Sequence, residues 1–262
     1  MTPRALAAAA WLIAWQAASQ AVSQRFLLVS PPRAIAALIA LMGTAPFYVA
    51  VLSSFGRILA GFALAMALGV LLALAAHRLR WVAALLAPAM AAVKATPVAS
   101  FVILALIWVP SRHLSVLTGF LMVLPIAYVN ALAGLKSADA HLIEMARVFR
   151  LPPLTRLRAI YLPAAWPHLV AACELSLGLC WKAGIAAEVI GLPDRSIGAA
   201  LYQAKVFLNT PELFAWTIAI VLISQAFEKG ALAALRRCRV GQPKAGRRGR
   251  DGDARGGAEQ VV

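Results

Sequence analysis

The feature that most constrains the fold is a stretch of 19 residues, 58–76, that contains no charged side chain. A helix needs about 20 mostly apolar residues to cross the hydrocarbon core of a bilayer. The remaining sequence agrees, since 62% of the 262 residues are hydrophobic and 13% are charged. Soluble domains have about 45–50% apolar and about 25% charged residues. The chain is therefore predicted to be an integral membrane protein, not a soluble enzyme, a disordered chain or a disulfide scaffold.

Six segments are predicted to span the membrane: residues 5–22, 47–76, 81–109, 114–135, 164–190 and 213–235. The first is the most polar, and its basic start leaves a signal peptide open as an alternative. Prolines interrupt the third and fourth segments (Pro88, Pro97, Pro125), so these helices are expected to be broken and supported by neighbouring helices. We expect an all-α membrane protein with about six transmembrane helices.

The formal net charge of +15 would also suit a nucleic-acid-binding protein, so its distribution matters. With the N-terminus in the cytoplasm, sixteen Lys and Arg residues fall in the inside segments and five in the outside segments. This asymmetry follows the positive-inside rule and predicts that both termini are cytoplasmic. We expect the lipid bilayer as a partner and no nucleic acid. The basic tail, 236–262, is predicted to be disordered and to contact anionic lipid, and the three cysteines are expected to be reduced.

The segment between the fourth and fifth spans, 136–163, is too polar to cross the membrane. Asp139 can cap a helix start, and the apolar residues that follow it share one helical face. Pro152 and Pro153 are expected to end this helix and to begin a second, which Leu162 and Pro163 end before the fifth span. From the residues alone, such a pair of short amphipathic helices could also lie on the lipid surface.

Residues 144–150 read Glu-Met-Ala-Arg-Val-Phe-Arg, and residues 160–163 read Ile-Tyr-Leu-Pro after nine further residues. This pattern resembles the cytoplasmic EAA loop of the permease subunits of bacterial ABC importers, which is Glu-Ala-Ala, three residues, Gly, nine residues, then Ile-x-Leu-Pro. Met145 stands at the first Ala and Arg150 stands at the Gly. A Gly there suits a left-handed helix end, so with Arg we expect the turn to be made differently, by the prolines that follow.

The resemblance implies a cytoplasmic two-helix coupling (EAA) loop between helices 4 and 5 that docks into a separate ATPase subunit. The implied coupling residues are Leu142, Glu144, Ala146, Arg147, Phe149, Arg150 and Leu151. Ala146 would allow close backbone approach to the ATPase, and Leu142 and Phe149 would fill apolar pockets there. The chain has no Gly-x-x-x-x-Gly-Lys-Ser/Thr run, so we expect no cofactor on this chain and ATP on the partner subunit.

The resemblance also implies a domain division and an assembly. Residues 1–46 would hold an N-terminal transmembrane helix and an outer loop, 47–235 the permease domain, and 236–262 the tail. The expected partners are ATPase subunits, an extracytoplasmic substrate-binding protein and a second permease copy, in the inner membrane of a bacterium.

Two shorter motifs are similar to the nitrate, sulfonate and taurine type of permease. They are Lys-Ala-Thr-Pro at 94–97 and Ala-Ala-Glu at 186–188. This similarity implies a small anion as the transported solute, whose path would cross the predicted transmembrane helices.

Ionisable residues far inside a span are costly and tend to face a path or a partner. Lys94 and Glu174 are such residues and are candidates for the translocation path, the alternative being a structural pair between packed helices. Lys182 and Glu188 lie near the outer end of the fifth span, where a purely structural role is favoured. Arg195, Ser196 and Lys205, in the following outside segment, are candidate contacts to the binding protein. That segment is equally consistent with an interfacial helix that closes an outer gate.

Other classes of protein have less support. A secondary transporter or channel is the main alternative, and it would need paired half-helices with internal symmetry, which the two halves of the sequence do not show convincingly. No His-Glu-x-x-His or Gly-x-Ser-x-Gly motif occurs. The chain is therefore expected to be a transport subunit and not an enzyme.

Overall fold

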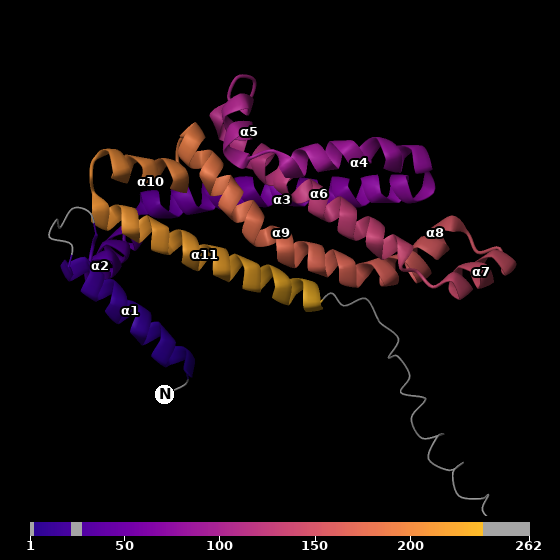
Figure 1. Ribbon diagram of the computed structural model, residues 1–262, viewed down its shortest axis with the longest axis horizontal. Helices are drawn as coiled ribbons and strands as arrows, with labels where there is room; N and C mark the ends of the chain where they lie inside the picture. Colours follow the sequence, from indigo (N-terminus) through magenta and orange to yellow (C-terminus); the bar gives the residue numbers. More distant parts are fainter. Residues whose placement is uncertain (1–2, 22–27, 238–262) are drawn as a thin grey trace, which may run out of the picture.

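The computed structural model describes residues 3–21 and 28–237, and every element in these ranges is helical, as predicted (Figure 1). In chain order the elements are α1 Pro3–Ala21, α2 Pro31–Met42, α3 Ala45–Arg78, α4 Arg80–Ala95, α5 Val98–Ala105, α6 Ser111–Lys136, α7 Ala140–Val148, α8 Pro153–Arg156, the π-helical η1 Leu157–Tyr161, α9 Leu162–Gly191, α10 Ile197–Val206 and α11 Thr210–Arg237. The predicted tail falls outside the described residues from 238 onward.

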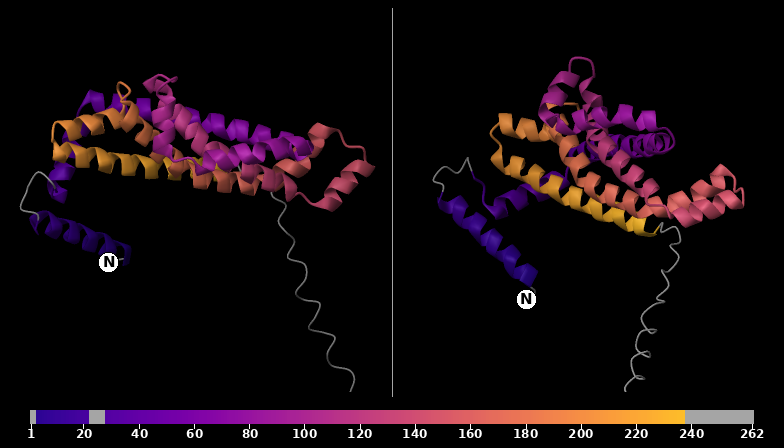
Figure 2. Two further views of the ribbon diagram at one scale, coloured as in Figure 1. Left: turned by 45° about the horizontal axis from the view of Figure 1, so that its top comes forward. Right: turned by 45° about the vertical axis from the view of Figure 1, so that its right-hand side comes forward.

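Three long helices, α3, α6 and α9, pack against one another and form the centre of the bundle. α11 packs against α2, α9 and α10 (Figures 1 and 2). α10 lies at one end of the bundle and α7 and α8 lie at the other (Figure 1). These are called the α10 end and the α7 end below.

Small residues let the central helices approach closely. A Cβ atom at Gly61 of α3 would lie 2.5 Å from the backbone oxygen of Val116 in α6. A Cβ atom at Gly134 of α6 would lie 2.7 Å from the Cα atom of Ala165 in α9. Because lipid chains are as apolar as the side chains, membrane helices associate through close packing of this kind. The many Ala and Gly residues of the chain thus determine how tightly α3, α6 and α9 fit together.

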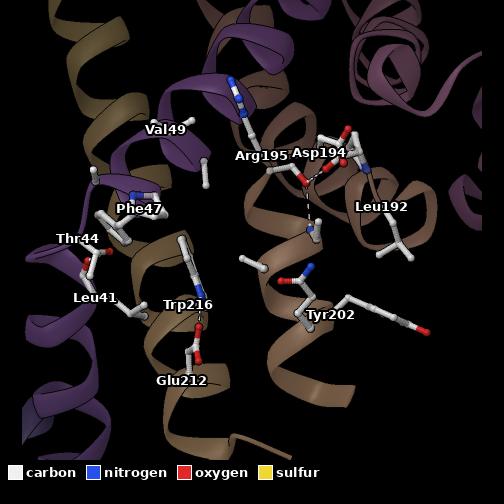
Figure 3. A pocket seen from close by; sticks show the side chains of 18 residues that line it. Leu41, Thr44, Phe47, Val49, Leu192, Asp194, Arg195, Tyr202, Glu212 and Trp216 are labelled. Carbon is white, nitrogen blue, oxygen red and sulfur yellow. Dashed lines mark hydrogen bonds between the residues drawn. The ribbon is translucent and has the colours of Figure 1, made fainter. Parts of the chain in front are cut away.

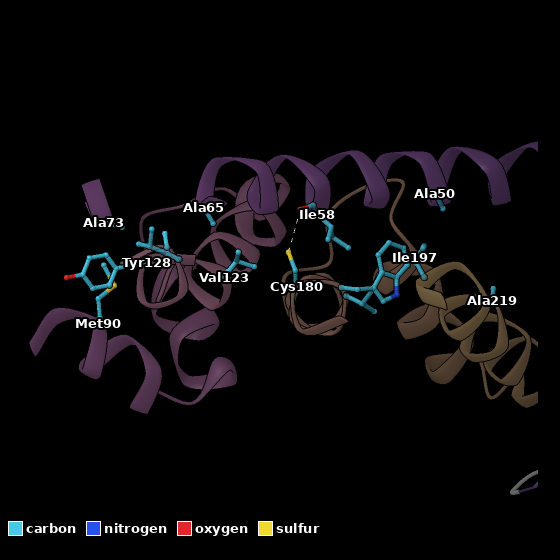
Figure 4. Packing of buried hydrophobic residues seen from close by; sticks show 14 of the residues in the cluster. Ala50, Ile58, Ala65, Ala73, Met90, Val123, Tyr128, Cys180, Ile197 and Ala219 are labelled. Carbon is cyan, nitrogen blue, oxygen red and sulfur yellow. Dashed lines mark hydrogen bonds between the residues drawn. The ribbon is translucent and has the colours of Figure 1, made fainter. Parts of the chain in front are cut away.

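Buried aliphatic and aromatic side chains run along the length of this packed centre (Figure 4). Ile58 of α3 is fully buried, and its backbone oxygen accepts a hydrogen bond from Cys180 Sγ of α9 at 3.6 Å. Cys173 and Cys180 are free thiols, as predicted, whereas Cys238 lies outside the described residues. Large apolar side chains such as Leu64 and Leu71 are exposed on the outside of the bundle, which suits contact with lipid.

The number of spans differs from the six predicted. In the described ranges, four helices are long and apolar enough to cross a membrane: Ala45–Arg78, Ser111–Lys136, Pro153–Gly191 and Thr210–Leu235. α4 and α5 together give a fifth span if the bend of 100° between them is counted within one crossing. The first predicted segment does form the helix α1. Its polar residues keep α1 out of the group of helices that are apolar enough to cross a membrane. Its length was predicted correctly and its apolar character was overestimated.

The bend between α4 and α5 falls at Thr96 and Pro97. Pro97 has no backbone N–H to continue α4, and it pushes the residue before it out of the helical region. Thr96 accordingly has an extended backbone, with φ −78° and ψ 126°. The third predicted segment is therefore broken, as its proline indicated, whereas Pro88 and Pro125 lie within continuous helices.

Candidate functional site

The most polar buried cluster of the described chain surrounds Glu188, near the C-terminal end of α9. The Glu188 side chain is fully buried. Its carboxylate accepts hydrogen bonds from the hydroxyl groups of Ser54 at 2.6 Å and Ser115 at 3.2 Å. It also accepts from the backbone N–H of Gly198 at 3.3 Å and forms an ion pair with Arg57 at 3.4 Å. These donors lie on α3, α6 and α10, so one carboxylate joins four helices.

Two further hydrogen bonds extend this cluster to the loop before α10. The Ser54 hydroxyl accepts from the backbone N–H of Ile197 at 3.0 Å. Arg57 donates from its second terminal nitrogen to the backbone oxygen of Asp194 at 3.0 Å. A buried carboxylate is costly unless it is paired and fully hydrogen-bonded. Because Asp194, Ile197 and Gly198 of α10 and its loop take part in these bonds, the Glu188 cluster connects the α10 end to α3 and α6.

Sequence reasoning placed Glu188 correctly near the end of its span but did not find its partners. Arg57 was visible as the one charged residue within the predicted span 47–76. An ionisable residue at such a position calls for a partner of opposite charge on another helix. Ser54 and Ser115 gave no comparable signal, since isolated serines are common in membrane helices.

A cavity of about 840 Å³ lies beside this cluster at the α10 end, between α2, α3, α10 and α11 (Figure 3). Phe47 and Trp216 stack within it at 5.1 Å between ring centroids. Trp216 donates from its indole nitrogen to Glu212 at 3.4 Å. Asp194 and Arg195 also line the cavity, so its wall combines aromatic faces with charges of both signs. Such a wall is suited to contact with a polar partner or solute.

The loop between α9 and α10 has an unusual backbone. Leu192 and Arg195 both adopt left-handed conformations, with φ of 49° and 53°. This region is unfavourable for residues with a Cβ atom, and such strain often lies at functional sites.

The three predicted contact residues of this loop and of α10 lie in different environments. Arg195 and Lys205 are exposed, and the Lys205 ammonium lies 5.9 Å from the ring centroid of Tyr202. Ser196 is buried. Its hydroxyl accepts a hydrogen bond from the N–H of Ala199 and so forms the N-cap of α10. The Ser196 side chain is thus used within the chain, and its contact with the binding protein stays a prediction.

Lys94 and Glu174, the predicted path residues, are not brought together. Lys94 is exposed near the end of α4, which packs against α3 and α6. Glu174 is half-buried on α9. Within the described residues, α4 and α9 do not pack closely against each other. Lys94 and Glu174 therefore differ in exposure, and their roles in a path or in packing stay predictions.

At the opposite end, α7 carries the residues of the predicted coupling loop. Asp139 caps α7, as predicted, by accepting the N–H of His141 at 2.9 Å. Leu142 is 43% exposed and Phe149 is 71% exposed, so this apolar side of the helix has no partner within the described chain. Ala146, predicted to allow close backbone approach to the ATPase, is fully buried within the chain.

The end of α7 corrects the prediction about the turn. Arg150 itself adopts the left-handed conformation, with φ 48°. The N–H of Leu151 donates to the oxygen of Ala146, and the N–H of Arg150 donates to that of Arg147, both at 3.0 Å. This is the hydrogen-bond pattern that usually places Gly at the left-handed position. Thus Arg150 makes the turn that Gly would make, and α7 ends before Pro152.

The second predicted helix of the loop does begin at Pro153, but it does not end at Pro163. The helix runs on through η1 into α9, so 153–191 is one continuous helical segment. The N–H of Leu162 donates to the oxygen of Leu157, five residues earlier. This π-type turn comes directly before Pro163, which lacks an N–H of its own. The inserted residue lets the helix pass the proline where the sequence predicted a stop.

No group of three or more His, Cys, Asp or Glu side chains that could hold a metal ion occurs within residues 3–21 and 28–237. The polar clusters described above are built from single carboxylates with serines and arginines. Such groups position helices and contact charged partners.

Comparisons with known proteins give a consistent family. Residues 65–227 match the sequence model of the binding-protein-dependent transport system inner membrane component. The putative aliphatic sulfonates transport permease protein SsuC of Bacillus subtilis is 31% identical over 98 residues, which is 37% of this chain and 35% of that protein. The taurine transport system permease protein TauC of Escherichia coli is 26% identical over 229 residues, or 85% of this chain and 83% of that protein.

The match to the SsuC proteins of Bacillus subtilis and Escherichia coli thus spans about a third of their length, whereas the match to TauC is nearly complete. The riboflavin transport system permease protein RibX of Chloroflexus aurantiacus is 27% identical over 56% of this chain and 54% of its own length. These relatives are all named as transport permeases. The chain belongs to the family of inner-membrane components of binding-protein-dependent transport systems.

Proposed function

We propose that this chain is the permease subunit of an ATP-driven importer for a small sulfonate-type anion. α7 and the turn at Arg150 would dock into a separate ATPase subunit. The α10 end would receive the solute from an extracytoplasmic binding protein. ATP would be bound only by the partner, because this chain carries no phosphate-binding loop.

The observation that carries the coupling role is the exposed side of α7. Apolar side chains that are left exposed on a well-ordered, capped helix are typical of a protein interface. Leu142 and Phe149 supply the apolar contacts, while Glu144 and Arg147 are exposed beside them and would fix the register through charge pairs. Arg150 and Leu151 form the turn that holds this surface rigid.

The proposed translocation path lies between two copies of the chain. The contacts among α3, α6 and α9 are too close for a solute to pass through one copy, as Gly61 and Gly134 illustrate. One face of α9 is exposed along its length and carries Leu175, Leu179 and Lys182. We assign this face to the boundary with the second copy, where Lys182 would meet the anion. Lys94 and Glu174 remain candidates for the mouth and the wall of that path.

The proposed solute class rests on the relatives. SsuC and TauC are named for the transport of aliphatic sulfonates and taurine, and a cationic Lys182 on the exposed face of α9 suits an anion. Arg195 and Lys205, both exposed at the α10 end, would contact the binding protein.

The proposed orientation puts the α7 end and both termini in the cytoplasm, which requires α1 to cross the membrane as a sixth span. The exposed Arg147, Arg150 and Arg158 gather at that end, which agrees with the positive-inside rule.

Co-purification in mild detergent tests the proposal. The cognate ATPase, expressed from the same operon or supplied from a relative, is expected to co-purify with the wild-type chain and to be lost from Glu144→Arg. Asp194→Arg is the matched control, since it makes the same charge change at an exposed residue of the opposite end. An ATPase that binds Glu144→Arg as well as the wild type would show that α7 is not the docking surface. Solute uptake without any ATPase would instead favour a secondary transporter.

A further inference from the structure

A second cavity, of about 540 Å³, lies at the α7 end between the last turn of α3, the end of α6 and the α8–η1 segment. One part of its wall carries the cationic Arg78 and Arg156 beside the His77 ring. The remainder is largely apolar and includes Leu74, Leu135 and Leu157. No acidic residue lines this cavity, in contrast to the cavity at the α10 end. Its lining therefore combines apolar side chains with charges that are all positive.

Several contacts fix the cationic part in place. The Arg156 Nε donates to the backbone oxygen of Leu151 at 2.8 Å, which orients its guanidinium. The rings of His77 and Tyr161 meet edge to face at 5.2 Å between centroids. Lys136 and Arg78 place positive charge near the His77 ring. Within the described residues, no carboxylate forms an ion pair with Arg78 or Arg156, so this cationic cluster has no counter-charge of its own.

The cavity also lies at the depth of the lipid headgroups. Arg78 is the last residue of α3 and Lys136 is the last residue of α6, and both helices are membrane spans. Below them, the wall passes to Leu74 and Leu135 within the apolar part of the spans. Basic pockets between membrane helices at this level bind the headgroups of anionic lipids.

The geometry points to a binding site for an anionic phospholipid, with the phosphate at Arg78 and Arg156 and the acyl chain along Leu74 and Leu135. The apolar half of the wall favours a lipid over a free phosphate ion, which would use only the cationic half. Because Arg156 is anchored on Leu151 in the turn after α7, the bound lipid stabilises the loop proposed to dock the ATPase. This role rests on the proposed function, but the lipid site itself requires only that the helices span a membrane.

Lipid binding to the purified chain in detergent tests the site, with dioleoyl phosphatidylglycerol, dioleoyl phosphatidylcholine and inorganic phosphate as probes. Native mass spectrometry would report the bound lipid and its affinity. The double variant Arg78→Gln/Arg156→Gln is compared with Arg80→Gln/Arg158→Gln, which removes two neighbouring exposed arginines that do not line the cavity. Each cation near an anionic headgroup contributes roughly fivefold in affinity. The first variant should therefore bind phosphatidylglycerol about 30-fold more weakly, and the second should match the wild type.

Ala75→Phe provides a variant that keeps every charge and fills the apolar part of the cavity, since Ala75 lines it. It should also weaken phosphatidylglycerol binding. Equal losses in the two double variants would overturn the inference, because the effect would then be general surface charge. Phosphate binding as tight as that of phosphatidylglycerol, or unchanged lipid binding by Ala75→Phe, would overturn it as well. None of these results depends on whether an ATPase co-purifies, so failure here is distinguishable from failure of the proposed function.

Discussion

Replacing Glu188 by Ala tests how the α10 end is held against the bundle. The carboxylate accepts from Ser54, Ser115 and Gly198 and pairs with Arg57. Removing it leaves two hydroxyl groups and one N–H without their acceptor and Arg57 without its counter-charge. These groups come from three helices other than α9, so the loss should loosen the contact of α10 with the other helices.

The magnitude follows from the burial of the pair. Removing one partner of a buried ion pair costs about 3–5 kcal/mol, because the other charge stays uncompensated. The Arg57 side chain is 21% exposed, so water compensates part of its charge and the lower end of this range applies. We expect Glu188→Ala to lower the free energy of unfolding by about 3 kcal/mol. For a chain of this length that corresponds to a decrease of roughly 6–12 °C in melting temperature.

Thermal unfolding in detergent, followed by tryptophan fluorescence, measures this shift. Glu144→Ala is the matched control, since Glu144 is an exposed helical residue at the other end, and it should change the melting temperature little. Glu188→Gln should give an intermediate loss, because a carboxamide keeps one acceptor oxygen but not the charge. Amide hydrogen exchange should also become faster in α10 in Glu188→Ala, before any other helix is affected.

Equal melting temperatures for Glu188→Ala and Glu144→Ala would refute this reasoning. So would a loss of stability in Glu188→Ala without faster exchange in α10, because the carboxylate would then not connect α10 to α3 and α6.

Three further outcomes are expected. Arg150→Gly should stabilise the end of α7 by up to about 1 kcal/mol, because Gly adopts the left-handed conformation without strain. Proteolysis of the loop should then be slower than in the wild type, and faster cleavage would contradict this prediction. Gly61→Val should lower the melting temperature of the purified chain through overpacking against α6, whereas Gly56→Val, at a position with no atom within 4 Å of its added Cβ, should be tolerated. Leu179→Cys should cross-link between two copies in membranes, while the exposed Leu71→Cys on α3 should not; the reverse pattern would place the second copy elsewhere.

The hydropathy of the sequence was sufficient to predict the helical class and the main spans. The spans and their helical structure both depend on local composition. About 20 consecutive apolar residues favour the membrane over water, and within lipid their backbone groups must pair inside the helix. Asp139 was likewise recognisable as a helix cap, since capping uses atoms within three residues of each other. The resemblance to the permease family rested on the spacing between Glu144 and Pro163, which is also a property of the linear chain.

Local rules were wrong where a neighbouring structure changed the outcome. Pro163 was expected to end a helix, yet a π-type turn at 157–161 carries the helix past it. Arg150 was expected to avoid the left-handed conformation, yet it adopts it. In each case the preference of one residue amounts to about 1–3 kcal/mol, which hydrogen bonds and packing of the surrounding loop exceed.

The sequence by itself therefore determined that this protein is helical, lies in a membrane and carries a loop that resembles the coupling loop of importer permeases. Only the tertiary structure decided which buried polar groups meet. Ser54 and Glu188 are 134 residues apart, and no pattern along the chain relates them. Lys94 and Glu174 were the pair that depth in the membrane suggested, but α4 and α9 do not pack closely against each other. The physical reason is that helix formation depends on neighbours within a few residues, whereas the pairing of charges depends on which helix faces touch.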